Sequence, residues 1–169
     1  MNKWSKFYEK RINSSYQQYF EKRYKPFLNM IRGESSREVF EAGCGIGSVS
    51  KYLDTYTNKF CSGIDLCSEM VSLANKNLNA TDMFEQGDIF TYSTTELTVT
   101  HGVLEYFSDE QIIQILSQYP NSIHYVPTDK YTTPSFGDER LLSVDHWIKL
   151  VNPKELILFN NHHDLAFKI

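Results

Sequence analysis

Three glycines at alternate positions, Gly43, Gly45 and Gly47, follow an apolar run and precede a helical pattern. Glycine permits positive φ and lets a ligand approach bare backbone, and a helix that begins there offers unpaired N–H donors. The spacing differs from the dinucleotide fingerprint, in which the third glycine follows the second by three positions, and no Gly-Lys-Ser/Thr phosphate loop is present. Glu41 precedes these glycines; its carboxylate would repel a pyrophosphate but suits a ligand that carries an ammonium or a sulfonium.

Two further carboxylates stand where later strand-like runs end. Asp65 closes the run 60–64, 18 residues after Gly47, and Asp88 follows the short run 83–85. In nucleotide-binding α/β sheets, a carboxylate at the end of the second strand accepts hydrogen bonds from the ribose hydroxyls. Either one alone could be a loop cap or a solvated charge. In order, at consecutive strand ends, they predict a nucleoside-type ligand.

Candidate proton-transfer groups follow the fourth expected strand: His101, Glu105 and Tyr106. A general base is needed only if the reacting nucleophile is a hydroxyl or a protonated amine. Each has an alternative role, because His101 can contact a cofactor through its backbone, Glu105 can cap the next helix and Tyr106 can line a pocket. We expect His124, inside a strand, to be a hydrogen-bonded core residue. The histidines at 162–163 fall in the terminal turn, far from the strand ends, so no metal site is expected.

The elements that must position these residues alternate along the chain. Aromatic and aliphatic residues recur every three or four positions over 4–31 and predict one helix, bent or interrupted at Pro26. Ser68 and Ser108 stand at expected N-cap positions, and Gln111 completes a capping box with Ser108. The pattern then predicts strands at 38–40, 60–64, 83–85, 97–100 and 123–126, helices at 49–56, 68–78, 109–118 and 138–151, and a terminal hairpin of 155–159 with 165–169.

This alternation predicts an α/β fold: a doubly wound, mostly parallel sheet with helices on both faces. The chain has 169 residues, which fits a single domain over 1–169, with a capping or lid helix in 1–32 and a Rossmann-like core in 37–169. No stretch reaches the roughly 18 to 20 apolar residues that span a bilayer, and no secretory signal is visible. Three cysteines are an odd number without a Cys-x-x-Cys pair, so we expect reduced thiols and a cytoplasmic location.

The motifs together resemble the class I S-adenosylmethionine-dependent methyltransferases over nearly the whole chain. Residues 41–47 are similar to the first motif of that superfamily, Asp/Glu-x-Gly-x-Gly-x-Gly, and residues 63–74 to its second. Residues 87–89 look like the third motif, and residues 101–107 match the fourth-strand motif except that Tyr106 stands where a histidine is common. The resemblance implies seven strands in the order 3-2-1-4-5-7-6, with the seventh antiparallel.

The resemblance also implies S-adenosyl-L-methionine as the cofactor and in-line methyl transfer as the reaction. Asp65 would bind the ribose, Met70 would lie near the adenine, Asp88 would accept from the adenine amino group, and Tyr16 of the capping helix would touch the methionine end. The full expected cofactor set is Tyr16, Glu41, Gly43, Cys44, Gly45, Gly47, Asp65, Leu66, Met70, Asp88, Ile89 and His101. The expected acceptor-binding residues are Tyr8 of the first helix and Lys130, Tyr131 and Arg140, which follow the fifth strand.

The acceptor class is narrowed by what the chain lacks. The Asp/Asn-Pro-Pro-aromatic motif of adenine amino methyltransferases is missing after the fourth strand, no Pro-Cys nucleophile exists, and there is no length for the extra domain of protein arginine methyltransferases. Residues 1–32 hold eight Lys and Arg against two Glu, but the net charge of −4 argues against a broad nucleic-acid surface. A small-molecule acceptor methylated on O or N is expected. An RNA methyltransferase and a non-catalytic cofactor-binding scaffold remain alternatives, and the oligomeric state is left open.

Overall fold

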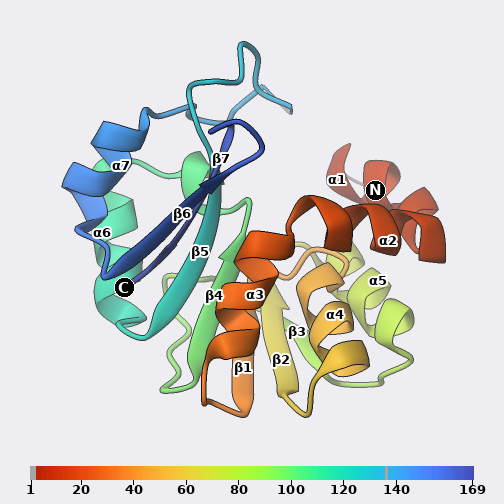
Figure 1. The fold of residues 1–169 in the computed structure, drawn as a ribbon. Helices are drawn as coiled ribbons and strands as arrows, with labels where there is room; N and C mark the ends of the chain where they lie inside the picture. The colour runs from red at the N-terminus through yellow and green to blue at the C-terminus, as the bar shows by residue number, and fades with distance from the viewer. Residues whose placement is uncertain (1–2, 136) are drawn as a thin grey trace.

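The computed structural model describes residues 3–135 and 137–169, and its centre is one seven-stranded sheet (Figure 1). The strand order is β3-β2-β1-β4-β5-β7-β6, with β7 antiparallel to both β5 and β6 and all other neighbours parallel. The strands are β1 (Glu38–Ala42), β2 (Phe60–Asp65), β3 (Phe84–Gln86), β4 (Leu97–His101), β5 (Ser122–Pro127), β6 (Glu155–Phe159) and β7 (Asp164–Lys168). The predicted fold class, strand order and terminal hairpin are confirmed.

Helices cover both faces of this sheet, as the alternation of side chains along each strand requires. In β1, Val39 packs into a core with the helices from the N-terminal half, whereas Phe40 packs on the opposite face against the helices that follow β4 and β5. The helices are α1 (Lys3–Tyr8), η1 (Glu9–Arg11), α2 (Ser14–Arg23), α3 (Lys25–Gly33), α4 (Ser48–Tyr56), α5 (Ser68–Leu78), η2 (Leu104–Tyr106), α6 (Asp109–Gln118) and α7 (Val144–Val151).

The N-terminal segment is interrupted just before Pro26, as expected, but it is also broken earlier, where the periodicity predicts a continuous helix. It forms α1, η1, α2 and α3, with a first break at Ile12 and Asn13 and a second at Tyr24. The Asn13 side chain accepts a hydrogen bond from the Tyr16 N–H (2.9 Å) and so begins a new helix, as N-cap residues do. Pro26 stands in the first turn of α3, where a proline costs no intrahelical hydrogen bond, so the chain turns just before it.

The expected helix over 138–151 is also wrong in its first half. Helix α7 begins only at Val144, because the side chain of Ser143 accepts from the His146 N–H (3.1 Å) and caps it. Asp138 and Glu139 therefore belong to the long loop after β5 instead of a first helical turn. The capping box of Ser108 is confirmed, whereas Ser68 is the first residue of α5 and is not its cap.

The elements leave α1, α2 and the long loop after β5 on the same side of the sheet, at the top and upper right of Figure 1. Residue 136 of that loop lies outside the described residues. Within the described ranges, no helix is long and apolar enough to span a membrane. The carboxyl ends of the parallel strands point toward this side, where ligands bind in open α/β sheets.

Candidate active site

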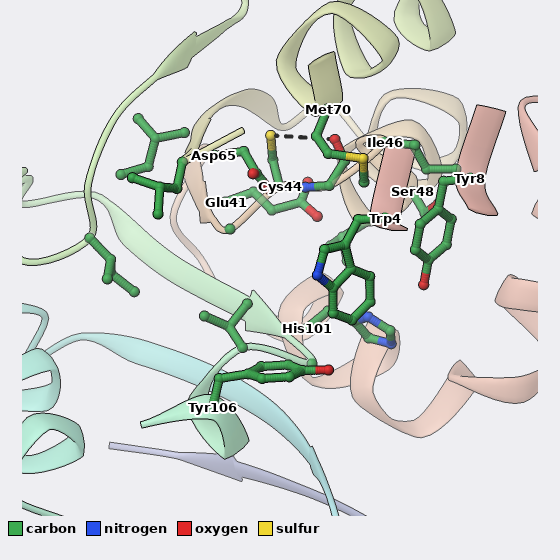
Figure 2. Close-up of a pocket in the computed structure, with 18 of the residues that line it drawn as sticks. Trp4, Tyr8, Glu41, Cys44, Ile46, Ser48, Asp65, Met70, His101 and Tyr106 are labelled. Atoms are coloured by element: carbon green, nitrogen blue, oxygen red, sulfur yellow. Dashed lines mark hydrogen bonds between the residues drawn. The ribbon is translucent and has the colours of Figure 1, made fainter. Parts of the chain in front are cut away.

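A cavity of about 370 Å³ opens at the carboxyl ends of β1, β2 and β4 (Figure 2). In Figure 2, Asp65, Cys44 and Met70 lie together at one end of it, His101 and Tyr106 at the other. This first cavity is lined by Trp4, Tyr8, Tyr16, Phe20, Glu41, Gly43, Cys44, Gly45, Ile46, Ser48, Val49, Ile64, Asp65, Leu66, Met70, Gly87, Asp88, Ile89, Phe90, His101, Gly102, Val103, Tyr106 and Phe107. Every residue expected to bind the cofactor, with the exception of Gly47, is among them.

The glycine loop turns with three positive φ angles, +73° at Gly43, +55° at Gly45 and +70° at Gly47. A Cβ added to Gly45 would contact only the Met70 Cε, at 3.5 Å, so its backbone faces open space in the cavity. A Cβ on Gly47 would instead meet the Leu78 Cδ1 of α5 at 2.9 Å. Gly47 thus permits close packing of α5 against the start of α4. We expected it among the cofactor-binding residues, but it does not line the cavity.

Asp65 closes the loop from the neighbouring strand. Its Oδ2 accepts from the Gly45 N–H and its Oδ1 from the Cys67 N–H, both at 2.9 Å. Burial raises the pKa of this carboxyl, while the two backbone donors act in the opposite direction. The Asp65 carboxylate lies at the cavity wall beside the exposed side chain of Leu66. This pair suits a ligand whose hydroxyl groups bond to the carboxylate and whose apolar ring contacts the leucine.

Glu41 is buried at the end of β1, and its Oε2 accepts from the Ser50 hydroxyl (2.6 Å) and the Ser50 N–H (3.2 Å). Burial raises the pKa of this carboxyl to about 7, although both bonds from Ser50 oppose the shift. A cationic ligand in the cavity would favour the ionised form of Glu41. The residue therefore acts in two ways, fixing the start of α4 and setting the charge of the cavity.

These residues fit S-adenosylmethionine. Three carboxylates, those of Glu41, Asp65 and Asp88, line the first cavity, whereas its described lining contains no Lys or Arg. A cavity of this charge repels a pyrophosphate and attracts a sulfonium and an ammonium. Asp88 follows β3, and its Oδ1 accepts from the Phe90 N–H (2.9 Å). Met70, Ile89 and Phe90 supply the apolar surface that an adenine ring needs.

A second cavity, of about 610 Å³, adjoins the first on the side of α1, α2 and the long loop. The two share six lining residues: Trp4, Tyr8, Tyr16, His101, Gly102 and Tyr106. Glu105, Tyr131 and Glu139 line only the second. Ligands bound one in each cavity would therefore lie next to each other.

His101 ends β4 inside an aromatic cluster. Its ring stacks on Tyr125 (centroids 4.5 Å apart, 17° between planes), and the Tyr24 ring meets it edge-on at 4.2 Å. Its Nε2 is buried without a hydrogen-bond partner among the described residues, and burial lowers the pKa of the imidazole to about 3. His101 is therefore neutral and a weak base. His124, by contrast, is the predicted core histidine, bonded to Thr100 and Ser122.

Glu105 and Tyr106 form the turn η2 beyond His101. The Glu105 side chain is 3% exposed, and its Oε2 has no hydrogen-bond partner among the residues described. Ser108 caps α6, so Glu105 does not. The Tyr106 hydroxyl donates to the Glu139 Oε1 (2.8 Å), and the Glu139 Oε2 accepts from the Ser135 N–H (2.6 Å), which ties the long loop to η2.

The structure separates the residues expected to hold the acceptor. Tyr8 and Tyr131 line the second cavity, but Lys130 is exposed and lines neither. Arg140 is turned away from both cavities, because its guanidinium pairs with Asp109 (2.6 Å) and donates to the Phe107 carbonyl. Tyr131 is tied to Asp164 of β7, whose Oδ1 accepts from its hydroxyl at 2.8 Å.

Sequence reasoning missed several lining residues: Trp4, Phe20, Val103, Phe107 and Glu139. Trp4 and Phe20 belong to the aromatic residues that recur along the first expected helix, so the sequence did single them out. That periodicity does not distinguish a residue of the core from one that lines a cavity. No signal marked Glu139, which a helical interpretation placed in a solvated first turn. No group of described His, Cys, Asp and Glu side chains has the arrangement to hold a metal ion.

Comparisons with known proteins agree with this geometry. The structure resembles that of a protein from Pyrococcus horikoshii (15% identity, TM-score 0.74, 93% of this chain and 92% of that one). It also resembles magnesium protoporphyrin IX methyltransferase from Synechocystis, solved with bound SAH (16%, 0.67, 96% and 86%). A third match, human N-acetylserotonin methyltransferase in complex with SAM, is 14% identical with a TM-score of 0.66, and the match covers 90% of this chain but 53% of the human one. No curated protein sequence matches the chain.

The fold and the acidic nucleoside cavity thus define a class I methyltransferase. A family model described as a methyltransferase domain matches residues 39–123, half of the chain, and the chain belongs to this family. The protein is an S-adenosylmethionine-dependent methyltransferase, and S-adenosyl-L-methionine is its cofactor.

Proposed function

We propose that this enzyme transfers the methyl group of S-adenosylmethionine to an oxygen or nitrogen of a small molecule. The observation that carries the proposal is the second cavity, which adjoins the first, shares six residues with it and has a volume typical of small-molecule sites, about 300–1,000 Å³. Its boundary includes α1, α2 and the loop after β5, so an acceptor there is covered by segments far apart in sequence.

The residues of the first cavity would hold the cofactor. Asp65 would accept from the ribose hydroxyls, Asp88 from the adenine amino group, and Leu66, Met70 and Ile89 would contact the ring. Gly43, Cys44 and Gly45 would present backbone to it, and Glu41 and Tyr16 would face its methionine end. The bound cofactor supplies an electrophilic methyl carbon, so what the protein adds is mainly alignment and the exclusion of water.

The N-terminal helices would provide part of that exclusion. Phe27, Leu28 and Ile31 of α3 are fully buried against the sheet, so α3 belongs to the core. Trp4 and Tyr8 of α1 and Tyr16 of α2 line both cavities. We therefore assign the lid to α1 and α2, within one domain that spans residues 1–169.

Among the candidate proton-transfer groups, the geometry favours Glu105. His101 has a lowered pKa and is surrounded by rings, which suits a neutral wall of the cavity. The Tyr106 hydroxyl already donates to Glu139, so it would hold the long loop and shape the acceptor site. Glu105 lines the second cavity, and its Oε2 has no hydrogen-bond partner among the described residues, so this carboxylate can take a proton.

The test is methyl transfer to a fractionated extract. The enzyme would be incubated with methyl-labelled S-adenosylmethionine and three fractions of a cell extract, namely small metabolites, RNA and protein. Label in the metabolite fraction alone is the expected result. Label in the RNA fraction would establish the RNA alternative. Binding of the cofactor without transfer to any fraction would indicate a scaffold or sensor.

A further inference from the structure

The second cavity is lined by two acidic side chains, Glu105 and Glu139, that form no ion pair with any described Lys or Arg. Glu105 is buried and Glu139 is half-buried, and a carboxylate withdrawn from water beside a second one requires a counter-charge or a proton. No described side chain pairs with either acid to supply that counter-charge.

The two cations that line the cavity are engaged elsewhere. Arg23 forms an ion pair with the fully buried Asp164 (3.1 Å) and also donates to the Tyr131 hydroxyl. The Arg11 guanidinium lies 3.4 Å from the centre of the Phe7 ring and donates to the Phe7 carbonyl. Neither arginine therefore serves Glu105 or Glu139.

Aromatic rings accompany these carboxylates. The Trp4 ring meets the Tyr106 ring edge-on, with centroids 5.6 Å apart, and stacks beside Tyr8 at 6.3 Å. All three rings line both cavities. Aromatic faces attract an organic cation through their quadrupole, and such rings beside a carboxylate form a common type of ammonium site. The neutral His101 adds no positive charge that would repel a cation.

We propose that the methyl acceptor is an amine, bound as its ammonium by Glu105 and Glu139 beside Trp4, Tyr8 and Tyr106. This inference rests on the proposed function and narrows its acceptor class. An alcohol or a carboxylate would leave the paired acids without a counter-charge, and a carboxylate would add a third negative charge to them. An ammonium supplies the charge and donates hydrogen bonds to the carboxylates of these two lining residues.

Glu105 also provides the proton step that an amine needs. Its carboxylate takes one proton from the ammonium, and the nitrogen lone pair that is freed forms the new N–C bond. The C–S bond breaks at the same time, and its electron pair stays on sulfur, which becomes a neutral thioether, while the N-methyl product carries the positive charge. Burial and the nearby Glu139 raise the pKa of Glu105 to about 8, which suits proton exchange with an amine.

The test compares probes that differ in charge but little in shape. Phenethylamine, 2-phenylethanol and phenylacetate would be titrated at millimolar concentration into the protein saturated with S-adenosylhomocysteine. Binding would be followed by ligand-observed NMR and by tryptophan fluorescence, in which the change reports on Trp4, because Trp4 lines both cavities and Trp147 lines neither. The amine is expected to bind at least about tenfold more tightly than the alcohol, as a buried charge pair requires.

Two variants then locate the cation site. Glu105→Gln is expected to abolish the preference for the amine, whereas the exposed Glu38→Gln serves as a matched control and should leave it unchanged. S-adenosylhomocysteine affinity measured in each variant verifies the fold. The proposal is overturned if no probe binds, if the alcohol or phenylacetate binds as tightly as the amine, or if Glu105→Gln keeps the preference.

The outcomes separate this inference from the proposed function. A labelled metabolite that carries its new methyl group on oxygen would overturn the amine acceptor while small-molecule transfer stands. A failure to label any small metabolite would overturn the proposed function, whatever the probes bind. An N-methylated product together with loss of amine binding in Glu105→Gln would support both.

Discussion

Replacing Asp65 by Asn tests the cofactor site at its most specific contact. In the free protein this carboxylate accepts from two backbone N–H groups, of Gly45 and Cys67, at 2.9 Å each. Asn is nearly isosteric, but its amide offers one acceptor atom and no charge. Ribose hydroxyls would therefore lose one charge-assisted hydrogen bond and keep a weaker second one.

The size of the effect follows from those bonds. A hydrogen bond to a charged group contributes about 1.5–3 kcal/mol, so the substitution should weaken S-adenosylhomocysteine binding by about 2.7 kcal/mol, roughly 100-fold. At a ligand concentration about 100 times the wild-type Kd, mass action stabilises the wild type by about 2.7 kcal/mol and the variant by about 0.4 kcal/mol. For a chain of this length these values correspond to a rise in Tm of about 8 °C and about 1 °C.

Thermal unfolding with and without the ligand measures this directly. Each protein is compared with its own ligand-free form, because the variant also loses one of the two backbone bonds, from Gly45 or Cys67, and starts from a lower Tm. The exposed Asp82→Asn controls for the loss of a carboxylate and should keep the full rise. A variant Asp65→Asn that shows the wild-type rise would remove Asp65 from the site and refute the reasoning.

Three further predictions concern residues that support the site. Gly63→Ala should lower the free energy of unfolding, measured in urea, by about 1–3 kcal/mol, because the new Cβ would clash with the Glu41 carbonyl oxygen. The control Gly33→Ala, with open space around its Cβ, should change that free energy by less than about 1 kcal/mol, and equal effects of the two substitutions would contradict the packing argument. Burial raises the pKa of Glu41 to about 7, so the stability that the protonated carboxyl contributes is complete below about pH 4.5 and is lost as the pH rises through 7. Between these two pH values, the free energy of unfolding of the ligand-free wild type should fall by about 3 kcal/mol more than that of Glu41→Gln. The same pH dependence in both proteins would contradict this prediction. Asp164→Ala should lower the free energy of unfolding by about 3–5 kcal/mol, because it leaves Arg23 and the hydroxyls of Tyr125 and Tyr131 without their buried acceptor. A decrease as small as that of the exposed control Asp82→Ala would show that this network contributes little to stability.

The sheet was predictable because its signals are local and repeated. Short apolar runs alternate with helical patterns, and the four residues between 159 and 164 leave no room for a crossover, so the last two strands must be antiparallel. The capping box at Ser108 set the start of α6 to the residue. These features depend on residues that are close in sequence, so a single sequence is enough to predict them.

The helix boundaries at 12–13 and 138–143 were missed for a physical reason. Hydrophobic periodicity continues across Asn13, so the pattern suggests one helix, whereas the Asn13 side chain accepts from the Tyr16 N–H and begins a second helix there. Asp138 and Glu139 look like the acidic first turn of a helix, but Ser143 supplies the cap that starts α7. In both places a side-chain hydrogen bond outweighs the periodic pattern.

The two halves of the site differ in how far the sequence predicts them. Asp65, Asp88 and the glycine loop follow strand ends, so topology alone brings them to one cavity. The second cavity is assembled from α1, η2 and the long loop, which meet only in the tertiary structure. That packing brings Tyr106 to Glu139, and it pairs Arg140 with Asp109 instead of placing it in the cavity. The spacing of these residues in the sequence predicts neither contact.

The central claim is that the two cavities form one reaction centre, with the methyl donor in the first and the acceptor in the second. A crystal structure of the complex with S-adenosylhomocysteine tests it most directly. The account predicts the ribose hydroxyls at Asp65 and the thioether sulfur at the shared boundary, beside Gly102 and Tyr106. A ligand whose sulfur faces away from the second cavity, or whose ribose does not contact Asp65, would contradict it.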